Sequence, residues 1–456
     1  MTQSVAVPLW LLILILLFAA VTFASHFLFP SVRWFFRKRA ERVVARLNRR
    51  LAKPIEPFKL ARRFDMIQRL IYDPQVTQAI VDHAREEGVP ENVAFERARR
   101  YAREIVPAFS ASAYFGFGTR LARWLSRSLY RVHVGQFDQT VYDAIDPEAT
   151  VVFVMNHRSN MDYVLVTYLV AQTSALSYAV GEWARVWPLS AVIRSMGAYF
   201  IRRRSRGALY RRVLARYVQM ATDGGVTQAV FPEGGLSVTG RLGEPRLGIL
   251  SYIAADRDPT GREIVFVPVA LNYDWVLEDR ILVAAAQRGD RRFRPPRGHG
   301  ARAFLRHVWQ RLTRRFERFG RATVSFGAPL SMRDRAPTEE DVLPLGRDLM
   351  DRIAAVMPVL PVPLVARLLL ERSLPEPALR DRVQEALQAL AARDVPLPHG
   401  DADRLVADAL AVLRRRGLVV EGPGGVTPAP AEIPLLHFYA ASIEAHFDAG
   451  RPGPGP

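Results

Sequence analysis

The feature that most constrains this chain is its N-terminal segment, because residues 1–32 contain no Lys, Arg, Asp or Glu. Within it, residues 8–29 read PLWLLILILLFAAVTFASHFLF and are almost wholly apolar. This length is enough for a helix to cross the ~30 Å apolar core of a bilayer. A cleaved signal peptide would need a basic segment before its apolar core, and Met1–Val7 has none. We therefore predict a transmembrane anchor over residues 8–29.

Positive charge follows the apolar segment at once. The basic residues are Arg33, Arg37, Lys38, Arg39, Arg42, Arg46, Arg49 and Arg50, against Glu41 alone. Because basic flanks stay on the cytoplasmic side, we expect the short N-terminus outside and the body of the chain inside. The predicted localisation is the cell inner (plasma) membrane, with a single-pass anchor. Anionic headgroups would attract such a cluster by about 1 kcal/mol per charge.

The overall composition describes a globular protein with a basic surface. The chain has 456 residues, 49% of them hydrophobic and 24% charged, which is enough to form a sizeable core. It has no cysteine, which excludes a disulfide scaffold, a thiolate nucleophile and a Cys-ligated metal site. The formal net charge of +18 suits nucleic acid, anionic lipid, an anionic substrate or a merely solvated surface. Charge by itself leaves these possibilities open.

The middle of the chain alternates strand-like and helix-like segments. Short runs rich in β-branched residues lie at 150–155, 228–231, 263–269 and 323–326, and helical patterns lie at 162–171 and 209–220. This alternation predicts an α/β domain with a central sheet flanked by helices, at 105–335. We expect a basic helical region at 33–104 before it, a helical region at 336–448 after it, and a disordered tail at 449–456.

One helix-like stretch in this region has a mixed character. Residues 110–132 read SASAYFGFGTRLARWLSRSLYRV, in which aromatic or aliphatic residues alternate with Arg at roughly helical spacing. Such a pattern fits a helix on a membrane surface and fits an amphipathic helix of the core equally well. The sequence leaves both interpretations open.

The strongest local signal is the heptapeptide NHRSNMD at 156–162, directly after a predicted strand. A His at the end of a strand and an Asp five residues later, where a helix starts, can bring imidazole and carboxylate together. The carboxylate then accepts from one ring nitrogen and leaves the other as a general base. Ser159 is a possible nucleophile, but the chain has no G-x-S-x-G elbow around it. In isolation, His157 also fits an ordinary structural histidine.

Two further motifs have features of anion sites. The segment FPEGGLSVTGR at 231–241 combines paired glycines with hydroxyls and Arg241, which suits an anionic oxygen. It lacks the Gly-Lys-Ser/Thr end of a nucleotide P-loop, so ATP chemistry is disfavoured. The segment GAYFIRRR at 197–204 places three arginines after a strand-like run, and arginine binds phosphate through paired hydrogen bonds.

Taken in order, these motifs resemble those of the H-x4-D glycerolipid acyltransferase family. His157 and Asp162 match H-x4-D, GAYFIRR resembles G-x-F-x-I-R-R, and EGGLSVTGR resembles E-G-G-x-S-x-T-G-R. Val267-Pro268-Val269 is similar to a fourth, apolar element, and LLHFYAASIEAHF at 435–447 is similar to the end of the glycerol-3-phosphate enzymes. The blocks are most similar to the bacterial type of glycerol-3-phosphate 1-O-acyltransferase, and the resemblance spans residues 94–448.

The resemblance implies a reaction and a set of residues for it. His157, oriented by Asp162, would deprotonate the sn-1 hydroxyl of glycerol 3-phosphate for attack on an acyl thioester of coenzyme A or acyl carrier protein. No covalent acyl-enzyme, metal or further cofactor is expected, and no nucleic-acid partner. The implied substrate-binding residues are Arg158, Ser159, Arg202, Arg203, Glu233, Gly234, Gly235, Ser237, Thr239, Gly240 and Arg241.

Two positions depart from the family pattern. Leu236 and Val238 stand where the third block usually has arginines. The loss of two cations beside a phosphate site keeps a second acceptor open, namely lysophosphatidate or another phosphorylated alcohol. A membrane-tethered basic scaffold or nucleic-acid binder is a more distant alternative.

Overall fold

A computed structural model describes residues 8–171, 173–181, 189–202, 207–255, 257–258, 260–289, 318–333 and 340–447, except the side chains of residues 20–37, 40 and 189. The chain divides into two compact units, Met1–Ile55 and Glu56–Pro456, and each is described by itself. The tail predicted at 449–456 lies outside the described residues. The domain boundaries predicted within 56–456 stay a prediction.

The first unit contains one long helix, α1 (Leu9–Asn48). The side chains from Leu9 to Phe18 are all large, apolar and exposed, from 36% at Leu11 to 73% at Phe18. Across the described part of the chain, no helix has both the length and the apolar character needed to cross a membrane. The predicted span of 8–29 extends into residues 20–37, whose side chains are outside that part, so the anchor stays a prediction.

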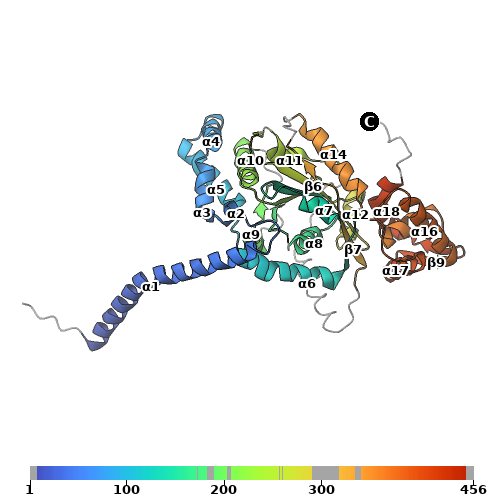
Figure 1. The fold of residues 1–456 in the computed structure, drawn as a ribbon, viewed down its shortest axis with the longest axis horizontal. Coiled ribbons are helices and arrows are strands. Elements are labelled where there is room, and N and C mark those ends of the chain that lie inside the picture. Colours follow the sequence, from blue (N-terminus) through green and yellow to red (C-terminus); the bar gives the residue numbers. More distant parts are fainter. Residues whose placement is uncertain are drawn as a thin grey trace, which may run out of the picture. The chain divides into compact units, whose positions relative to one another are not determined.

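The second unit is built around a mixed sheet (Figure 1). Its strands are β1 (Arg131–Val134), β2 (Thr150–Met155), β3 (Ser177–Val180), β4 (Tyr199–Phe200), β5 (Gln228–Val230), β6 (Ile264–Tyr273), β7 (Arg321–Phe326) and β8 (Leu330–Ser331). Their order is β1-β7-β6-β2-β5-β3-β4, with β8 also paired to β6. Strands β6, β2, β5, β3 and β4 are parallel, whereas β7 and β8 are antiparallel to β6. The predicted α/β sheet is confirmed, and each of the four predicted runs overlaps a strand.

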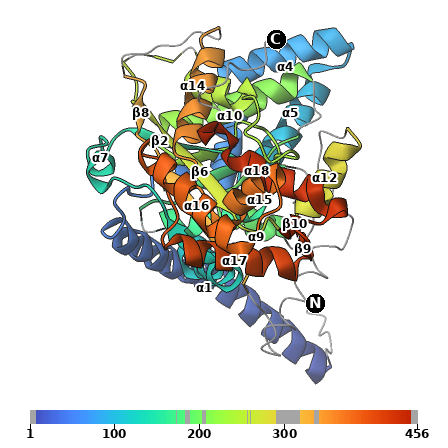
Figure 2. The same cartoon turned by 90° about the vertical axis from the view of Figure 1, so that its right-hand side faces the viewer.

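Helices cover both faces of this sheet. On one face lie α3 (Arg63–Ile71), α4 (Pro74–Glu87), α5 (Glu91–Ile105), α10 (Ala208–Asp223), α11 (Leu247–Ala254) and α14 (Val342–Ala355), and on the other lie α6 (Thr119–Leu129) and α8 (Met161–Val170) (Figures 1 and 2). Successive strand residues point to opposite faces of a sheet. Val152 and Val154 of β2 therefore pack in the core on the side of α10, and Val151 and Phe153 pack in the core on the side of α8. The sheet is therefore buried on both sides, as its parallel strands require.

Shorter helices fill the connections of the second unit. They are α2 (Pro57–Leu60), the π-helix η1 (Ser112–Gly118), α7 (Gln139–Asp143), α9 (Leu189–Ser195) and α12 (Asp279–Gln287). The segment η1 leads directly into α6, and the two replace the single helix-like stretch predicted at 110–132.

The C-terminal region is mostly helical, as predicted, but it contains a hairpin. Its helices are α15 (Pro361–Glu371), α16 (Glu376–Ala391), α17 (Ala402–Arg415), η3 (Pro430–Glu432), α18 (Ile433–Ala440) and η4 (Ala441–His446). Strands β9 (Val419–Gly422) and β10 (Gly425–Pro428) form an antiparallel pair between α17 and η3. Gly425 has φ +99°, and a Cβ there would lie 2.4 Å from the Pro375 backbone nitrogen, so the turn needs glycine. The sequence pattern did not predict this hairpin.

The functional motifs meet at one edge of the sheet. The parallel strands β2 and β5 both end at this edge, and the loops that follow them carry the first and third blocks. Ligands of open α/β sheets bind outside the carboxyl ends of such strands. The Asn156 side chain fixes the first loop there, since it donates to the Leu271 carbonyl (2.9 Å) and accepts from the Leu271 N–H (2.7 Å) of β6.

Candidate active site

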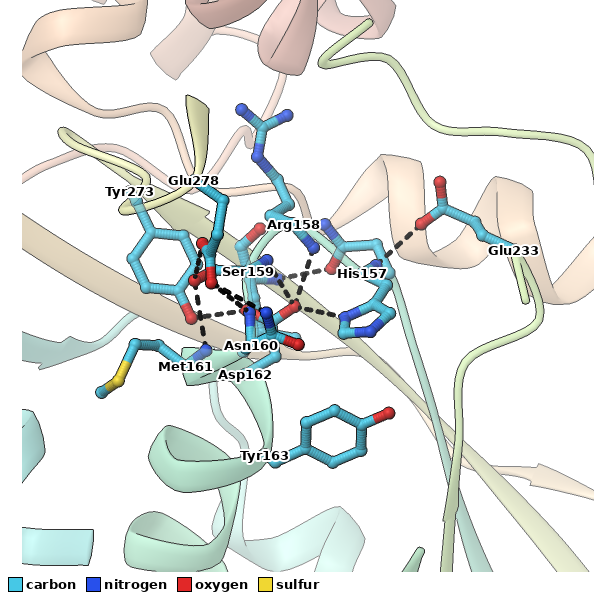
Figure 3. Close-up of polar contacts among 12 residues, drawn as sticks. His157, Arg158, Ser159, Asn160, Met161, Asp162, Tyr163, Glu233, Tyr273 and Glu278 are labelled. Atoms are coloured by element: carbon cyan, nitrogen blue, oxygen red, sulfur yellow. Dashed lines mark hydrogen bonds and ion pairs between the residues drawn. The ribbon is translucent and has the colours of Figure 1, made fainter. Parts of the chain in front are cut away.

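His157 and Asp162 form a buried pair at the start of α8. His157 follows the end of β2, and Asp162 lies in the first turn of α8, so the intervening loop folds imidazole back towards carboxylate. The distance from His157 Nδ1 to Asp162 Oδ2 is 2.9 Å, and both side chains are buried (Figure 3). The geometry predicted from the H-x4-D spacing is thus present in the structure.

Asp162 is held as an oriented hydrogen-bond acceptor. Its Oδ2 accepts from His157 Nδ1 and from the backbone N–H groups of Arg158 (2.7 Å) and Ser159 (3.0 Å). Its Oδ1 accepts from the hydroxyl of Tyr273 at 2.6 Å. An ionised carboxylate only accepts, so the proton of neutral His157 lies on Nδ1 and the lone pair is on Nε2. Nε2 is therefore the nitrogen that can act as a general base.

The imidazole ring is also held by aromatic packing. The Phe231 ring lies against it, with centroids 4.2 Å apart and planes inclined by 32°. Tyr163 approaches it edge-on, with centroids 5.3 Å apart. Phe231 directly follows β5, so the strand that leads into the third block also positions the base.

Glu233 connects the third block to the first. Its Oε1 accepts from the backbone N–H of His157 at 2.7 Å (Figure 3). Its Oε2 accepts from the N–H of Gly243 at 3.0 Å. Burial raises the pKa of this carboxyl from its ordinary 4.5 to about 7, although both N–H donors oppose the shift. Its contacts are backbone groups of the site, which suits an orienting role.

The rest of the third block folds into a compact loop. The Ser237 N–H donates to the His157 carbonyl (2.9 Å), and the Ser237 hydroxyl donates to the Arg241 carbonyl (2.7 Å). Thr239 accepts from the Arg241 N–H at 3.3 Å, and Gly235 lies half-buried beside them. The hydroxyls of this loop therefore support its own backbone.

Backbone conformation and close contacts explain why two positions of the loop are glycine. Gly234 has φ +66°, and Gly240 has φ +85°. A Cβ at Gly240 would lie 1.9 Å from the Phe438 carbonyl oxygen of α18, so no side chain fits there. The third block and the C-terminal region are in backbone contact at this point.

Comparison with known proteins agrees with this geometry. Residues 137–272 match the family model described as Acyltransferase, and residues 305–447 match the model described as Glycerol-3-phosphate acyltransferase C-terminal region. The chain belongs to the H-x4-D glycerolipid acyltransferase family. The first match contains His157 and Asp162, and the second contains the C-terminal elements that contact the third block.

The relatives are longer proteins. The glycerol-3-phosphate acyltransferase of Pseudomonas entomophila is 29% identical over 408 residues, which cover 81% of this chain and 47% of that protein. The glycerol-3-phosphate acyltransferase of Haemophilus ducreyi is 28% identical over 80% of this chain and 47% of its own length. This chain therefore spans about half the length of the curated relatives it matches. A solved 1-acyl-sn-glycerophosphate (LPA) acyltransferase of Thermotoga maritima is 19% identical over 52% of this chain and 76% of its own, with a TM-score of 0.32.

Arg158 of the family's first block is buried beneath the C-terminal region. Its Nη1 donates to the Gly240 carbonyl, and its guanidinium lies 4.9 Å from the centroid of the Phe438 ring. Its Nε and Nη2 are buried and have no hydrogen-bond partner among the described residues. A buried cation with free donors is expensive, and an anion at this place would satisfy it.

The arginines of the other two blocks have acidic partners instead. Arg202 is paired with Glu104 of α5, which raises the pKa of Arg202. Arg241 makes two bonds to Glu444 of η4, at 2.7 and 2.8 Å, and is 64% exposed. Arg203 lies outside the described residues. The structure thus brings Arg158 and Glu233 to the His157 loop, whereas Arg202 and Arg241 are held by ion pairs.

The two positions that depart from the family pattern are structural in this fold. Leu236 and Val238 are partly buried and pack against the core that contains α8 and the C-terminal helices. Arginines at these positions would have to leave that packing to reach solvent or a ligand.

Sequence reasoning missed two residues of the site. Glu278, at the N-terminal boundary of α12, accepts from the Ser159 hydroxyl (2.7 Å) and from the Asn160 side-chain amide (3.0 Å), and burial raises its pKa. Tyr273 ends β6 and binds Asp162. Both are more than 100 residues from the first block. The sequence offered one signal for them: Tyr273 ends the apolar strand that contains Pro268, and Glu278 follows five residues later.

The described residues contain no cluster of three or more His, Asp or Glu side chains that could hold a metal ion. The polar groups of the site instead form a chain of hydrogen bonds around one histidine.

Proposed function

We propose that this protein is a membrane-bound acyltransferase that moves a fatty acyl group from an acyl thioester to the sn-1 hydroxyl of glycerol 3-phosphate. This is the first step of phospholipid synthesis. The observation that carries the proposal is the buried His157–Asp162 pair with all four Asp162 hydrogen bonds formed. The acceptor is proposed from the relatives, which are named glycerol-3-phosphate acyltransferases.

In the proposed reaction, His157 Nε2 removes the proton of the acceptor hydroxyl as its oxygen attacks the thioester carbonyl. A C–O bond forms, the C–S bond breaks, and the imidazolium returns the proton to the departing thiolate of coenzyme A or acyl carrier protein. Asp162 stabilises the imidazolium through Nδ1. The products are 1-acyl-glycerol 3-phosphate and a free thiol.

Ser159 is a poor candidate for a nucleophile in this site. Its hydroxyl donates to Glu278 at 2.7 Å and accepts from the Met161 N–H at 3.1 Å. It is completely buried and not paired with His157. Direct transfer, without a covalent acyl-enzyme, therefore fits the geometry best.

For the acceptor phosphate, we propose the donors of Arg158 and the loop from Glu233 to Arg241. Arg158 supports this because two of its nitrogens have no partner among the described residues. Arg241 would have to leave Glu444 to reach a phosphate, and an exposed pair of this kind costs little to open. Arg202 and Arg203 complete the proposed set, and Arg202 would have to leave Glu104 to reach the phosphate.

A second acceptor, lysophosphatidate or another phosphorylated alcohol, is favoured by one observation. Leu236 and Val238 are apolar where the family pattern has arginines, and both are only partly buried against the core. An acceptor that already carries an acyl chain would find apolar surface there.

We also propose a membrane anchor at residues 8–29 in the inner (plasma) membrane, with residues 56–456 on the cytoplasmic side. The exposed apolar side chains of Leu9–Phe18 support it, because water-exposed runs of this size mark membrane or protein contacts. The basic residues that follow support the orientation.

The decisive experiment separates the products formed from labelled glycerol 3-phosphate with acyl-CoA or acyl carrier protein by thin-layer chromatography. We expect labelled 1-acyl-glycerol 3-phosphate, and a loss of about 10²–10⁴-fold in His157→Ala, which is the usual contribution of a general base. Lipid product from lysophosphatidate but none from glycerol 3-phosphate would favour the second acceptor. Full activity of folded His157→Ala would overturn the mechanism.

A further inference from the structure

The helix pair η1–α6 presents an exposed face that the proposed reaction does not use. Phe117 is 58% exposed and Trp124 is 41% exposed, and the side chains of Arg120, Arg123 and Arg127 are exposed between and beside them. We call these five residues the α6 face. The opposite side of α6, with Ala122, Ser126 and Leu129, is buried towards α8.

The spacing of these residues makes them one surface. Residues 117, 120, 124 and 127 are three or four apart, so they form a single stripe on the helical segment, and Arg123 adjoins it. Arg123 packs over the Tyr168 ring of α8, 5.7 Å from its centroid. Aromatic and basic side chains therefore alternate along the outer side of the element.

The charge of this surface has one sign. No Asp or Glu occurs between Val106 and Phe137, whereas this stretch contains Arg120, Arg123, Arg127 and Arg131. Exposed arginines without an acidic neighbour on their own helix leave a local positive potential that attracts anions. Indole and phenyl rings next to them prefer the level of lipid headgroups, where one side is apolar and the other wet.

The α6 face also extends towards the active-site end of the sheet. The Tyr130 ring, which directly follows α6, lies 5.3 Å from the ring of Tyr273. The Tyr273 hydroxyl in turn donates to Asp162. Figure 1 shows α6 on the outer side of α8, away from the sheet. A lipid surface against α6 would thus lie beside α8, which begins next to the His157–Asp162 pair.

We propose that the α6 face binds the surface of an anionic membrane, as a contact separate from the predicted anchor. The arginines bind lipid phosphates, and Phe117 and Trp124 insert among the headgroups. This contact would orient residues 56–456 so that the side with α6 and α8 faces the bilayer. The proposal does not depend on the identity of the acceptor.

Because the sequence contains no cysteine, a single introduced cysteine can be labelled specifically in the 456-residue chain. Phe117→Cys carries a bimane label on the α6 face, and Val93→Cys carries the same label at an exposed position of α5. Each protein is bound to vesicles of phosphatidylcholine and phosphatidylglycerol that contain doxyl-labelled lipid. We expect strong quenching at position 117, little at position 93, and weaker quenching at 117 when phosphatidylglycerol is left out or salt is added.

Substitution of the arginines then tests the cause. In Arg120→Gln/Arg123→Gln/Arg127→Gln, we expect the apparent association constant of the α6 face for the vesicles to fall by about fivefold per arginine at low salt. The matched control removes three exposed arginines of α4 and α10, as Arg85→Gln/Arg211→Gln/Arg212→Gln, and should keep the quenching. Arg120→Gln/Arg127→Gln leaves Arg123 on Tyr168 and serves if the triple variant unfolds.

The outcomes separate this proposal from the anchor and from the reaction. Equal quenching at positions 117 and 93, or undiminished quenching in both arginine variants, would overturn it. Loss of quenching in the control variant as well would show a general charge effect and would also overturn it. Product formation from glycerol 3-phosphate is measured separately, so failure of the proposed function leaves this test intact.

Discussion

At the scale of single residues, the site depends on how the Asp162 carboxylate is held. Three donors bind one of its oxygens, and among the described residues Tyr273 is the donor to the other. A hydrogen bond from a buried hydroxyl to a charged acceptor is stronger than one between neutral groups. Loss of the Tyr273 hydroxyl should therefore weaken the support of the Asp162 carboxylate. Tyr273 positions Asp162, which in turn positions His157.

We predict that Tyr273→Phe lowers kcat for acyl transfer by about tenfold with little change in KM, because it removes about 1.5 kcal/mol of support for the imidazolium that forms during transfer. The matched control is Tyr130→Phe, which removes a neighbouring buried hydroxyl that donates to the Trp275 carbonyl instead. Steady-state kinetics of both variants provide the measurement. An equal fall in both would mean that the effect is one of packing.

Glu233 gives a prediction about pH. Burial raises its pKa in the folded protein to about 7, so between pH 4.5 and 7 the folded state keeps a proton that the unfolded state has released. The folded state binds more protons there, so this residue's contribution to stability is full below pH 4.5 and is lost as pH rises through 7. In Glu233→Gln that pH-dependent loss is absent.

We therefore expect the stability of the wild type, relative to Glu233→Gln, to fall by about 3 kcal/mol between pH 4.5 and 8. Urea unfolding of both proteins at several pH values measures the difference. The Glu233→Gln variant also loses one of the two N–H bonds, to His157 or Gly243, but that cost is independent of pH. A difference that stays constant with pH would contradict the assigned pKa.

At this scale, the sequence predicted site residues that lie in one motif and missed residues that are close in the fold but distant in the sequence. His157 and Asp162 are five apart, so helix and loop geometry limits where they can lie. Tyr273 and Glu278 reach the same loop because β6 pairs with β2, a fact that no local spacing contains. Arg202 and Arg241 were predicted as phosphate ligands, but the sequence could not show that Glu104 and Glu444 would lie against them.

At the scale of elements, a buried ion pair fastens the C-terminal region to the end of the sheet. Arg416 follows α17 and pairs with Asp279, the first residue of α12, and the Tyr439 hydroxyl of α18 donates to the same carboxylate. The Arg416 guanidinium also lies 4.4 Å from the centroid of the Trp275 ring. Three helices therefore meet at one carboxylate that is 3% exposed.

We predict that Asp279→Asn destabilises the protein by about 3–5 kcal/mol, because it leaves the Arg416 charge buried without a counter-charge. The control is Arg382→Gln, which breaks an exposed pair with Glu385 on α16 and should change stability by less than about 1 kcal/mol. Urea unfolding curves compare the two. If Asp279→Asn/Arg416→Met is as unstable as Asp279→Asn alone, the unpaired charge is not the cause.

The elements themselves were largely readable from the sequence where apolar runs were long. Strands β2, β6 and β7 are rich in β-branched residues, and α10 has a clear apolar face. The hairpin β9–β10 was missed because each strand has only four residues, and five of the eight are polar, Gly or Pro. Val426 of the hairpin also forms a bridge with Leu374, which is far away in the sequence.

At the scale of the whole molecule, the net charge of +18 and the exposed apolar stretch of α1 point to the same environment. The proposed phosphorylated acceptor, acyl thioester carrier and anionic lipid are all anions, so a basic enzyme at a membrane would meet each of them with favourable charge. Two kinds of membrane contact would then act together. The anchor would be insensitive to salt, whereas the α6 face would be weakened by it.

We predict that Ile13→Lys/Leu16→Lys releases the protein from membranes in high salt, because each lysine in the middle of a spanning helix costs about 2.5–3.5 kcal/mol. The wild type should remain in the membrane pellet after the same wash. The control, Phe64→Lys/Val93→Lys, places two lysines at exposed apolar positions of α3 and α5 and should remain in the pellet with the wild type. The released protein should still acylate glycerol 3-phosphate from soluble acyl-CoA, since residues 56–456 form their own compact unit. Retention of the double-lysine protein after the wash would mean that residues 8–29 are not what holds the chain to the membrane.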